Sequence, residues 1–286
     1  MLRAIRSIAI KDRGVGDRLS LAFWYIKYLI TYYFVVELLH IKLHNERFGN
    51  FTLSFSDYQT FVGLFEEIFI FEVYAFSAQG GTPLILDCGS NIGLSVLYFK
   101  KYYPDAHIVC FEPQPTMAKY LEKNIAQNHL TSIDVHTVAI SNSPGVISLF
   151  SNPLQAGKTG TSITQRLREK TDAPYEETVS SVVLSAFIQG PVDFLKMDIE
   201  GAEVLVLEEL AVTGKLAMVN QMVVEYHDNL KTNPTNTLQT LLRILAENGF
   251  RYGIHSPTPP PWGQHYGRSY NLLVFAYKKD MKEFPL

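Results

Sequence analysis

Three things are scarce in this sequence: cysteine, net charge and an N-terminal leader pattern. Only Cys88 and Cys110 occur among the 286 residues, so we expect no disulfide and a reducing, cytoplasmic compartment. A formal net charge of −3 argues against a broad electrostatic grip on nucleic acid or on an anionic membrane, and favours a small-molecule or carbohydrate partner. Arg3 and Arg6 interrupt the first apolar stretch and no small-residue cleavage site follows, so we expect no signal peptide.

Long uncharged apolar runs are also missing. The aromatic stretch from Leu19 to Ile41 contains a lysine, a glutamate and a histidine, and its longest part without them is Tyr28 to Val36. A spanning helix needs about 20 mostly apolar residues, so we expect no integral membrane insertion. We interpret residues 1–55 as a helical accessory segment that packs against the main domain, forms a homodimer contact or lines the substrate entrance. Contact with a membrane surface is the least favoured of its roles.

One glycine is missing where a dinucleotide site would need it. The apolar run Leu84 to Cys88 leads into a glycine-containing turn and a helical pattern, which predicts a buried strand, a tight turn and a helix start. Glycines let the backbone approach a ligand, and the free N–H groups of a new helix attract a carboxylate or another anion. A dinucleotide site would read G-x-G-x-x-G. The turn instead reads Gly89, Ser90, Asn91, Ile92 and Gly93.

Two acids bear on which ribose-containing ligand binds, and only Asp87 discriminates between the candidates. Glu112 ends the next predicted strand, where a carboxylate can accept both ribose hydroxyls of NAD or of S-adenosylmethionine. Asp87 directly precedes the glycines, and a carboxylate sits poorly beside a pyrophosphate. Asp87 therefore favours a cationic ligand without phosphate, and the sulfonium and ammonium of S-adenosylmethionine fit that description. The alternative is that Asp87 only caps the turn.

Strands and helices alternate along most of the chain. This rhythm predicts an α/β domain over residues 56–286, with a parallel sheet and right-handed crossovers. The helix that begins this domain has Asp57 as its expected cap. Residues 151–175 are polar and contain glycine, which predicts a loop or lid. The expected strands of the domain span residues 84–88, 107–111, 134–138, 145–150, 177–184, 192–198, 218–224, 250–255 and 270–277.

Four ionisable residues follow two of these strands at their carboxyl ends, where open α/β sheets bind ligands. Asp198 and Glu200 follow one strand, and Glu225 and His227 follow the next. His227 is the first candidate for the base that removes an acceptor proton, with a structural histidine as the alternative. Asp198 would orient His227, hold the cofactor ammonium or bind metal. A rival mechanism uses Mg²⁺ or Mn²⁺ held by ligands from Asp198, Glu200, Glu225 and His227, with Asp198, Glu225 and His227 as the preferred set, although their spacing matches no definite metal motif.

Three blocks of residues resemble the signatures of FkbM-family methyltransferases. They are Leu86 to Gly93, Phe111 to Pro113 and Phe194 to Glu203, and the resemblance runs from about residue 72 to residue 275. It implies a seven-stranded, mostly parallel, Rossmann-like class I methyltransferase sheet with helices on both faces. It also implies S-adenosylmethionine-dependent O-methyl transfer to a hydroxyl of a sugar, polysaccharide or polyketide-like secondary metabolite. Cys88 departs mildly from the small residue usual there.

The predicted site extends beyond the turn. Glu72 and Tyr74 are expected near the methionine end of the cofactor, with a surface pair as the alternative, and Ala139 near the adenine. The expected cofactor contacts are Glu72, Tyr74, Asp87, Gly89, Ser90, Asn91, Gly93, Glu112, Pro113, Ala139 and Asp198. The expected catalytic residues are His227, Asp198, Glu200 and Glu225. The late residues that would roof the acceptor are His255, Trp262, His265, Tyr266 and Arg268.

Two other classes of function remain open. An NAD-linked oxidoreductase or epimerase would use the same fold, but the missing glycine and Asp87 disfavour it. A catalytically silent protein of this fold, whose N-terminal helices mediate assembly, would bind neither S-adenosylmethionine nor its demethylated product.

Overall fold

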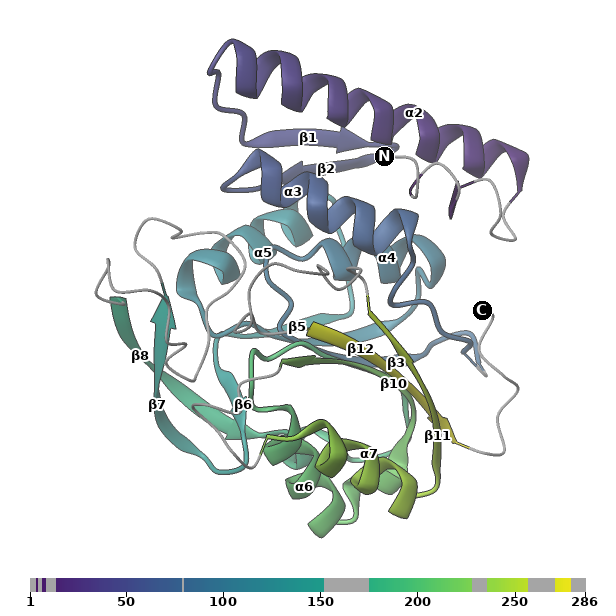
Figure 1. Cartoon of the computed structure of the whole chain (residues 1–286), viewed down its shortest axis with the longest axis vertical. Helices are drawn as coiled ribbons and strands as arrows, with labels where there is room; N and C mark the ends of the chain where they lie inside the picture. Colours follow the sequence, from purple (N-terminus) through teal and green to yellow (C-terminus); the bar gives the residue numbers. More distant parts are fainter. Residues whose placement is uncertain are drawn as a thin grey trace, which may run out of the picture.

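The computed structural model of the chain describes residues 4, 7, 8, 14–78, 80–151, 175–227, 236–256 and 271–278. A seven-stranded sheet in the order β11-β12-β10-β9-β3-β4-β5 forms its centre (Figure 1). The pairs from β10 to β5 are parallel, and β12 is antiparallel to both of its neighbours. The predicted α/β class with a mostly parallel sheet is confirmed. The strands are β3 (Leu84–Cys88), β4 (His107–Phe111), β5 (Ile133–His136), β9 (Val192–Met197), β10 (Val219–His227), β11 (Phe250–His255) and β12 (Asn271–Lys278).

Helices cover both faces of the sheet because its central strands are apolar on both sides. Within β3, Ile85 and Leu86 are fully buried and belong to two different apolar clusters, one on each face. Figure 1 shows α4 and α5 on one side of the sheet and α6 and α7 on the other. The helices are α4 (Leu94–Tyr102), α5 (Pro115–Gln127), α6 (Glu203–Val212) and α7 (Leu238–Glu247), with 3₁₀ segments η4 (Leu184–Phe187) and η5 (Lys215–Met218).

A second sheet stands beside the first. It contains β6 (Ala139–Ser141), β7 (Gly145–Ser151) and β8 (Tyr175–Val183), in the order β6-β8-β7. Strand β5 ends at His136, earlier than expected, and Ala139 begins a strand of this second sheet. Apart from its first and last residues, which lie in β7 and β8, the predicted lid is outside the described residues.

The N-terminal segment contains a β-hairpin in addition to the expected helix. Helix α2 (Val15–Thr31) continues as the π-helical η1 (Tyr32–Leu38), and strands β1 (Asn45–Phe48) and β2 (Phe51–Ser54) follow. The two residues between the strands include Gly49 at φ 56°, a backbone conformation that two-residue hairpin turns need. The glycine and asparagine of this turn were the sequence signal for the hairpin, and the prediction of helices alone was wrong here.

This segment packs against the main domain, as expected. The Tyr28 ring lies edge-on to Phe61 and Phe65, at centroid distances of 5.0 and 4.9 Å. Those residues belong to α3 (Tyr58–Phe65), which continues as η2 (Glu66–Ile70). The cap predicted at Asp57 is confirmed, since its carboxylate accepts a hydrogen bond from the Thr60 N–H at 2.8 Å. The N-terminal helix and the central sheet therefore share one apolar core.

The hairpin is also tied to the turn that follows β3. Asn124 on α5 is 1% exposed and accepts from the Ser54 N–H at 2.7 Å. Its amide donates to the carbonyl oxygens of Ser54 at 2.9 Å and Ile92 at 2.7 Å. One buried side chain thus satisfies backbone groups of β2 and of the turn together.

Candidate active site

The turn between β3 and α4 has the backbone geometry of a close-approach site. Gly89, Asn91 and Gly93 have positive φ angles of 85°, 51° and 85°. A Cβ added to Gly89 would lie 1.9 Å from the Asp198 carbonyl oxygen, and one added to Gly93 would lie 2.6 Å from Leu121 Cδ1. Glycine is therefore required at both positions. Among the described residues, no side chain forms a cap hydrogen bond at the start of α4. The first N–H groups of this helix point towards the turn.

Glu112 lies beside this turn, with its carboxylate bound by backbone N–H groups. Oε2 accepts from Asn91 at 2.8 Å, and Oε1 accepts from Gln114 at 2.9 Å. Burial raises the pKa of Glu112 to about 7, although both hydrogen bonds oppose the shift. Each oxygen of the ionised group keeps a further lone pair. Glu112 can therefore accept two ligand hydroxyls while it supports the turn.

Asp87 lies beneath the turn, where it cannot contact a ligand. Its side chain is fully buried, Oδ2 accepts from Ser95 Oγ at 2.6 Å, and Oδ1 lies 3.3 Å from Lys196 Nζ. Lys196 also donates to the Gly89 carbonyl oxygen at 2.6 Å. The expectation of a direct cofactor contact is therefore corrected. Asp87 organises the turn through Ser95 and Lys196, which is close to the alternative that it only caps the turn.

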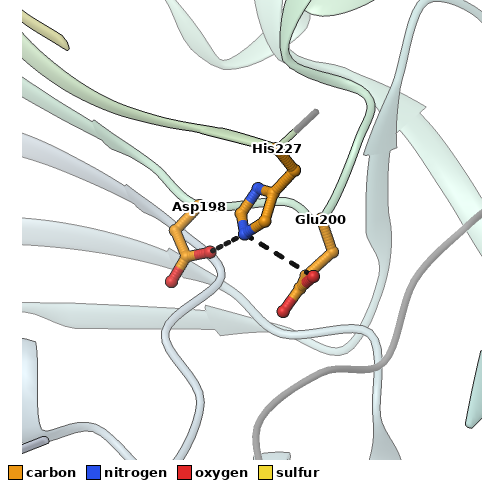
Figure 2. Close-up of side chains that lie close together, drawn as sticks. All are labelled: Asp198, Glu200 and His227. Carbon is orange, nitrogen blue, oxygen red and sulfur yellow. Dashed lines mark ion pairs between the residues drawn. The ribbon is translucent and has the colours of Figure 1, made fainter. Parts of the chain in front are cut away.

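Strand β10 carries His227 into a group of carboxylates (Figure 2). Nδ1 lies 2.8 Å from Glu203 Oε1, and Nε2 lies 3.5 Å from Glu225 Oε1. Nε2 is also 3.6 Å from Glu200 Oε2 and 3.8 Å from Asp198 Oδ1. The four predicted catalytic residues thus lie together, and their catalytic roles stay predictions. We call Asp198, Glu200, Glu203 and Glu225 the carboxylate cluster.

Charge decides the protonation of His227. Burial lowers the pKa of its imidazole, but Glu200, Glu203 and Glu225 outweigh this effect and raise the pKa well above its ordinary value. Burial also raises the pKa of Asp198 well above its ordinary value, and Glu225 adds to this shift. These charges favour the protonated form of the ring, which donates hydrogen bonds and cannot accept a proton. This arrangement argues against His227 as the base.

Backbone strain supports the cluster. Glu200 has a positive φ of 57°, which is unfavourable for a side chain of this size, and Gly201 follows at 113°. The Gly201 N–H donates to Glu203 Oε1 at 2.9 Å. The short loop after β9 thus turns back on itself and directs two carboxylates of the cluster to the same imidazole.

Three residues of the site were not predicted. Glu203 lies in the first turn of α6, where an acid commonly complements the helix dipole, and it is fully buried against His227. Lys196 is 2% exposed within apolar β9, and a lysine inside an apolar strand was the available signal, because a buried ammonium needs partners. Glu67 comes from η2, where burial followed by the charge of Glu225 raises its pKa to about 7. No local pattern links Glu67 to a site more than a hundred residues away in sequence.

The other predicted site residues lie at different distances from the carboxylate cluster and the turn. The Tyr74 ring lies 5.3 Å from Lys196 Nζ, so Tyr74 borders the cluster. Glu72 accepts from the Tyr102 hydroxyl at 3.3 Å, at the end of α4 away from the turn. The cofactor roles of Glu72, Pro113 and Ala139 stay predictions. His255 ends β11. The other expected roof residues lie outside the described part of the chain: Trp262, His265, Tyr266 and Arg268.

A divalent cation would have ligands in the same place. One ligand atom from each of Asp198, Glu200 and His227 lies within 4.8 Å of the other two. All three are among the four candidate ligands, and Glu225 of the preferred set is not part of this group. The Glu203 contact to Nδ1 is the kind of bond that orients a metal-binding imidazole. A metal needs the ring neutral, however, whereas Glu200, Glu203 and Glu225 favour its protonated form.

The sheet order, with one antiparallel strand, and the glycine turn at the carboxyl end of β3 define a Rossmann-like fold of the methyltransferase class. A family model described as the Methyltransferase FkbM domain matches residues 87–252. Since this match covers more than half of the 286 residues, the chain belongs to the FkbM methyltransferase family.

Individual proteins are also similar to this chain. Methyltransferase sdnD of Sordaria araneosa is 30% identical over 215 residues, which are 65% of this chain and 81% of that protein. Methyltransferase 1 of Beauveria bassiana (strain ARSEF 2860) is 24% identical over 213 residues, covering 68% and 83%. The crystal structure of methyltransferase FkbM from Methylobacillus flagellatus KT matches with a TM-score of 0.47 and 16% identity, over 70% of this chain and 45% of that one.

Proposed function

We propose that this methyltransferase is an S-adenosylmethionine-dependent O-methyltransferase that acts on a hydroxyl of a sugar, polysaccharide or polyketide-like secondary metabolite. The observation that carries the proposal is the position of two carboxylates around one turn. Glu112 hydrogen-bonds Asn91, and the backbone of Asp198 contacts Gly89. Glu112 fits the ribose of either ligand, and an ionised Asp198 attracts a sulfonium and an ammonium and repels the pyrophosphate of a dinucleotide.

The residues of the turn have distinct binding roles in this proposal. When bound, S-adenosylmethionine supplies the methyl group as an activated sulfonium. The N–H groups at the start of α4 would hold its carboxylate, because they lack a side-chain cap. Glu112 would accept the ribose hydroxyls, and the Asp198 carboxylate would face the cationic end. Lys196, bonded to the Gly89 carbonyl oxygen, keeps the turn in place.

Removal of the acceptor proton falls to Asp198 in this mechanism. Its side chain is 28% exposed, whereas His227 is 1% exposed, so the carboxylate is the group that an acceptor can reach. Its raised pKa makes it a better base than an ordinary aspartate near neutral pH. His227, fixed by Glu203 and positively charged, stabilises the ionised form of Asp198. His227 is thus a positioning residue.

Calorimetry with S-adenosylhomocysteine tests the cofactor. We expect the full-length protein to bind it and Glu112→Gln to bind about tenfold more weakly, because the amide loses acceptor strength. Glu247→Gln on the exposed side of α7 is the control and should bind like the original protein. Binding of NAD without binding of S-adenosylhomocysteine would restore the oxidoreductase alternative. Binding of neither ligand would favour the alternative of a catalytically silent assembly protein.

Transfer of a labelled methyl group tests the acceptor class. The protein is incubated with radiolabelled S-adenosylmethionine and a panel of sugars, polysaccharides and polyketide-type alcohols. Label in an ether-linked methyl group supports O-methylation. Label confined to nitrogen, sulfur or carbon acceptors, in a protein that binds the cofactor, would contradict O-methylation and leave the cofactor assignment intact.

A further inference from the structure

The long N-terminal helix presents a continuous apolar face to the outside. Figure 1 shows α2 along one edge of the molecule, with the β1–β2 hairpin and α3 on its inner side. The exposed side chains recur every three or four residues along most of the helix, which places them on one side of it. We call this set the outer apolar face. Its members, each 49–72% exposed, are Val15, Leu19, Phe23, Ile26, Ile30, Tyr33, Phe34 and Leu38.

Charged side chains are scarce on this face. From Leu19 to Val36, a stretch described throughout, every exposed residue is apolar or aromatic except for one serine, and the exposed Glu37 follows directly. The charged residues of α2 include Lys27, which is ion-paired with Glu46, and Asp17, which lies 3.0 Å from Lys101 Nζ. A monomeric soluble protein seldom exposes so long an uncharged surface unless something binds there.

The charge of the chain is divided unevenly around this face. Residues 1–44 contain seven lysines and arginines and three acids, a net charge of +4. Because the whole chain carries −3, the remaining 242 residues carry −7. The low overall charge therefore hides an N-terminal sequence segment that is basic and that includes the outer apolar face. That combination is complementary to anionic lipid headgroups above an apolar interior.

We propose that the outer apolar face attaches the protein in the plane of an anionic membrane. The apolar side chains enter the boundary between headgroups and acyl chains, and the net positive charge of residues 1–44 is attracted by the anionic headgroups. A second copy docked on the same face would bring two segments of +4 together, and their repulsion opposes that arrangement. The membrane is therefore the occupant that the charges favour.

The helix lies on the membrane and does not cross it. Val15–Leu38 has 24 residues and a mean hydropathy of 1.4, enough by length and composition to span. Its inner side is fixed to the protein, however. The hydroxyl of Tyr25 donates to Glu66 at 2.6 Å, and that of Tyr28 donates to the Arg47 carbonyl oxygen at 2.5 Å. Both rings are at most 1% exposed, so a crossing helix would lose these contacts and bury the Lys27 charge.

Vesicle flotation of the full-length protein tests the proposal. The vesicles contain phosphatidylcholine with about 30% phosphatidylglycerol, or phosphatidylcholine alone. The double variant Phe23→Gln/Ile30→Gln removes two members of the face. The matched control, Val212→Gln/Ile254→Gln, changes two residues that are 89% and 47% exposed elsewhere. We expect the original protein and the control to float with anionic vesicles. We expect the Phe23/Ile30 variant to bind these vesicles at least about tenfold more weakly.

Each other outcome contradicts the proposal. Failure of the original protein to float overturns it, as does equal binding of the Phe23/Ile30 variant. A dimer in analytical ultracentrifugation that this variant converts to monomer, without flotation, identifies a contact between copies. Resistance to alkaline carbonate extraction identifies a spanning helix. Near-UV circular dichroism checks that the double variant is folded, and Leu19→Gln replaces it if it is not.

Discussion

Gly89 and Asp198 touch through their backbones at the carboxyl edge of the sheet. The Asp198 N–H donates to the Cys88 carbonyl oxygen at 3.0 Å, and a Cβ on Gly89 would lie 1.9 Å from the Asp198 oxygen. Strands β3 and β9 are parallel neighbours, so the loops that leave them meet at the same edge. This contact sets the position of the Asp198 carboxylate relative to the turn between β3 and α4.

Gly89→Ala should disrupt the site through this contact. The added Cβ collides with backbone that cannot rotate away, and the residue has a φ of 85°, so we expect a loss of unfolding free energy of about 3 kcal/mol or more. Gly190→Ala is the matched control, because its Cβ would meet nothing within 4 Å. Urea unfolding and binding of S-adenosylhomocysteine measure both variants. Normal stability and binding in Gly89→Ala would contradict the geometry of the turn.

Glu112 should make the ligand-free protein less stable as the pH rises. Burial raises its pKa from the ordinary 4.5 to about 7, so the folded protein holds a proton that the unfolded chain releases. This contribution to stability is present below about pH 4.5 and is lost as the pH rises through about 7. It amounts to on the order of 3 kcal/mol. Glu112→Gln should gain stability relative to the original protein over this window, measured by urea unfolding at successive pH values. A difference between the two proteins that does not vary with pH would contradict the burial of an ionisable Glu112.

Asp198 and His227 should respond differently to substitution. We expect Asp198→Asn to lower kcat about a thousandfold, since the proton acceptor is lost. His227→Gln should lower kcat by only about ten- to a hundredfold and leave the KM for S-adenosylmethionine nearly unchanged, because a carboxylate still accepts the proton. The pH–rate profile of His227→Gln should also change, as its positive charge no longer holds the proton off Asp198. Retained turnover in Asp198→Asn together with inactive His227→Gln would restore the histidine as the base.

Chelation distinguishes the mechanism in which Asp198 accepts the proton without a metal from the metal-assisted mechanism. We expect methyl transfer to be unchanged after treatment with EDTA, because the protonated His227 ring already balances part of the negative charge of the cluster. The original protein is assayed before chelation, after it, and after addition of Mg²⁺ or Mn²⁺. Activity that disappears with EDTA and returns with either ion would assign Asp198, Glu200 and His227 as metal ligands.

Lys196 should be important for folding as well as for the site. Its replacement by methionine leaves Asp87, which is fully buried, without its cation, and we expect a loss of about 3–5 kcal/mol of unfolding free energy. Asp87→Asn/Lys196→Met should recover part of this loss, since the uncompensated charge is removed. The exposed pair of Arg243 and Glu247 is the comparison, and Arg243→Ala should change stability by about 0.5 kcal/mol or less. A loss in Lys196→Met as small as that of Arg243→Ala would contradict the role of the buried pair.

Local patterns were sufficient to predict most of the fold. The apolar run of β3, the glycines after it and the cap at Asp57 act within a few residues, so the sequence alone indicates their structure. Ligands collect at the carboxyl ends of parallel strands, which is why Glu112, Asp198, Glu200, Glu225 and His227 were predicted to belong to one site. The hairpin after η1 was missed because its strands are only four residues long and because backbone groups of β2 are held by Asn124 of α5, a residue distant in the chain.

The sequence by itself determined the class of fold, the cofactor turn and the strand-end acids, because each depends on residues that are neighbours in the chain. Only the tertiary structure decided what those acids do. It buried Asp87 against Lys196, placed Glu67 and Glu203 beside His227, and turned one side of α2 outwards. The physical reason is that protonation, charge balance and exposure depend on which groups meet in space, and groups far apart in the chain meet only when the protein folds.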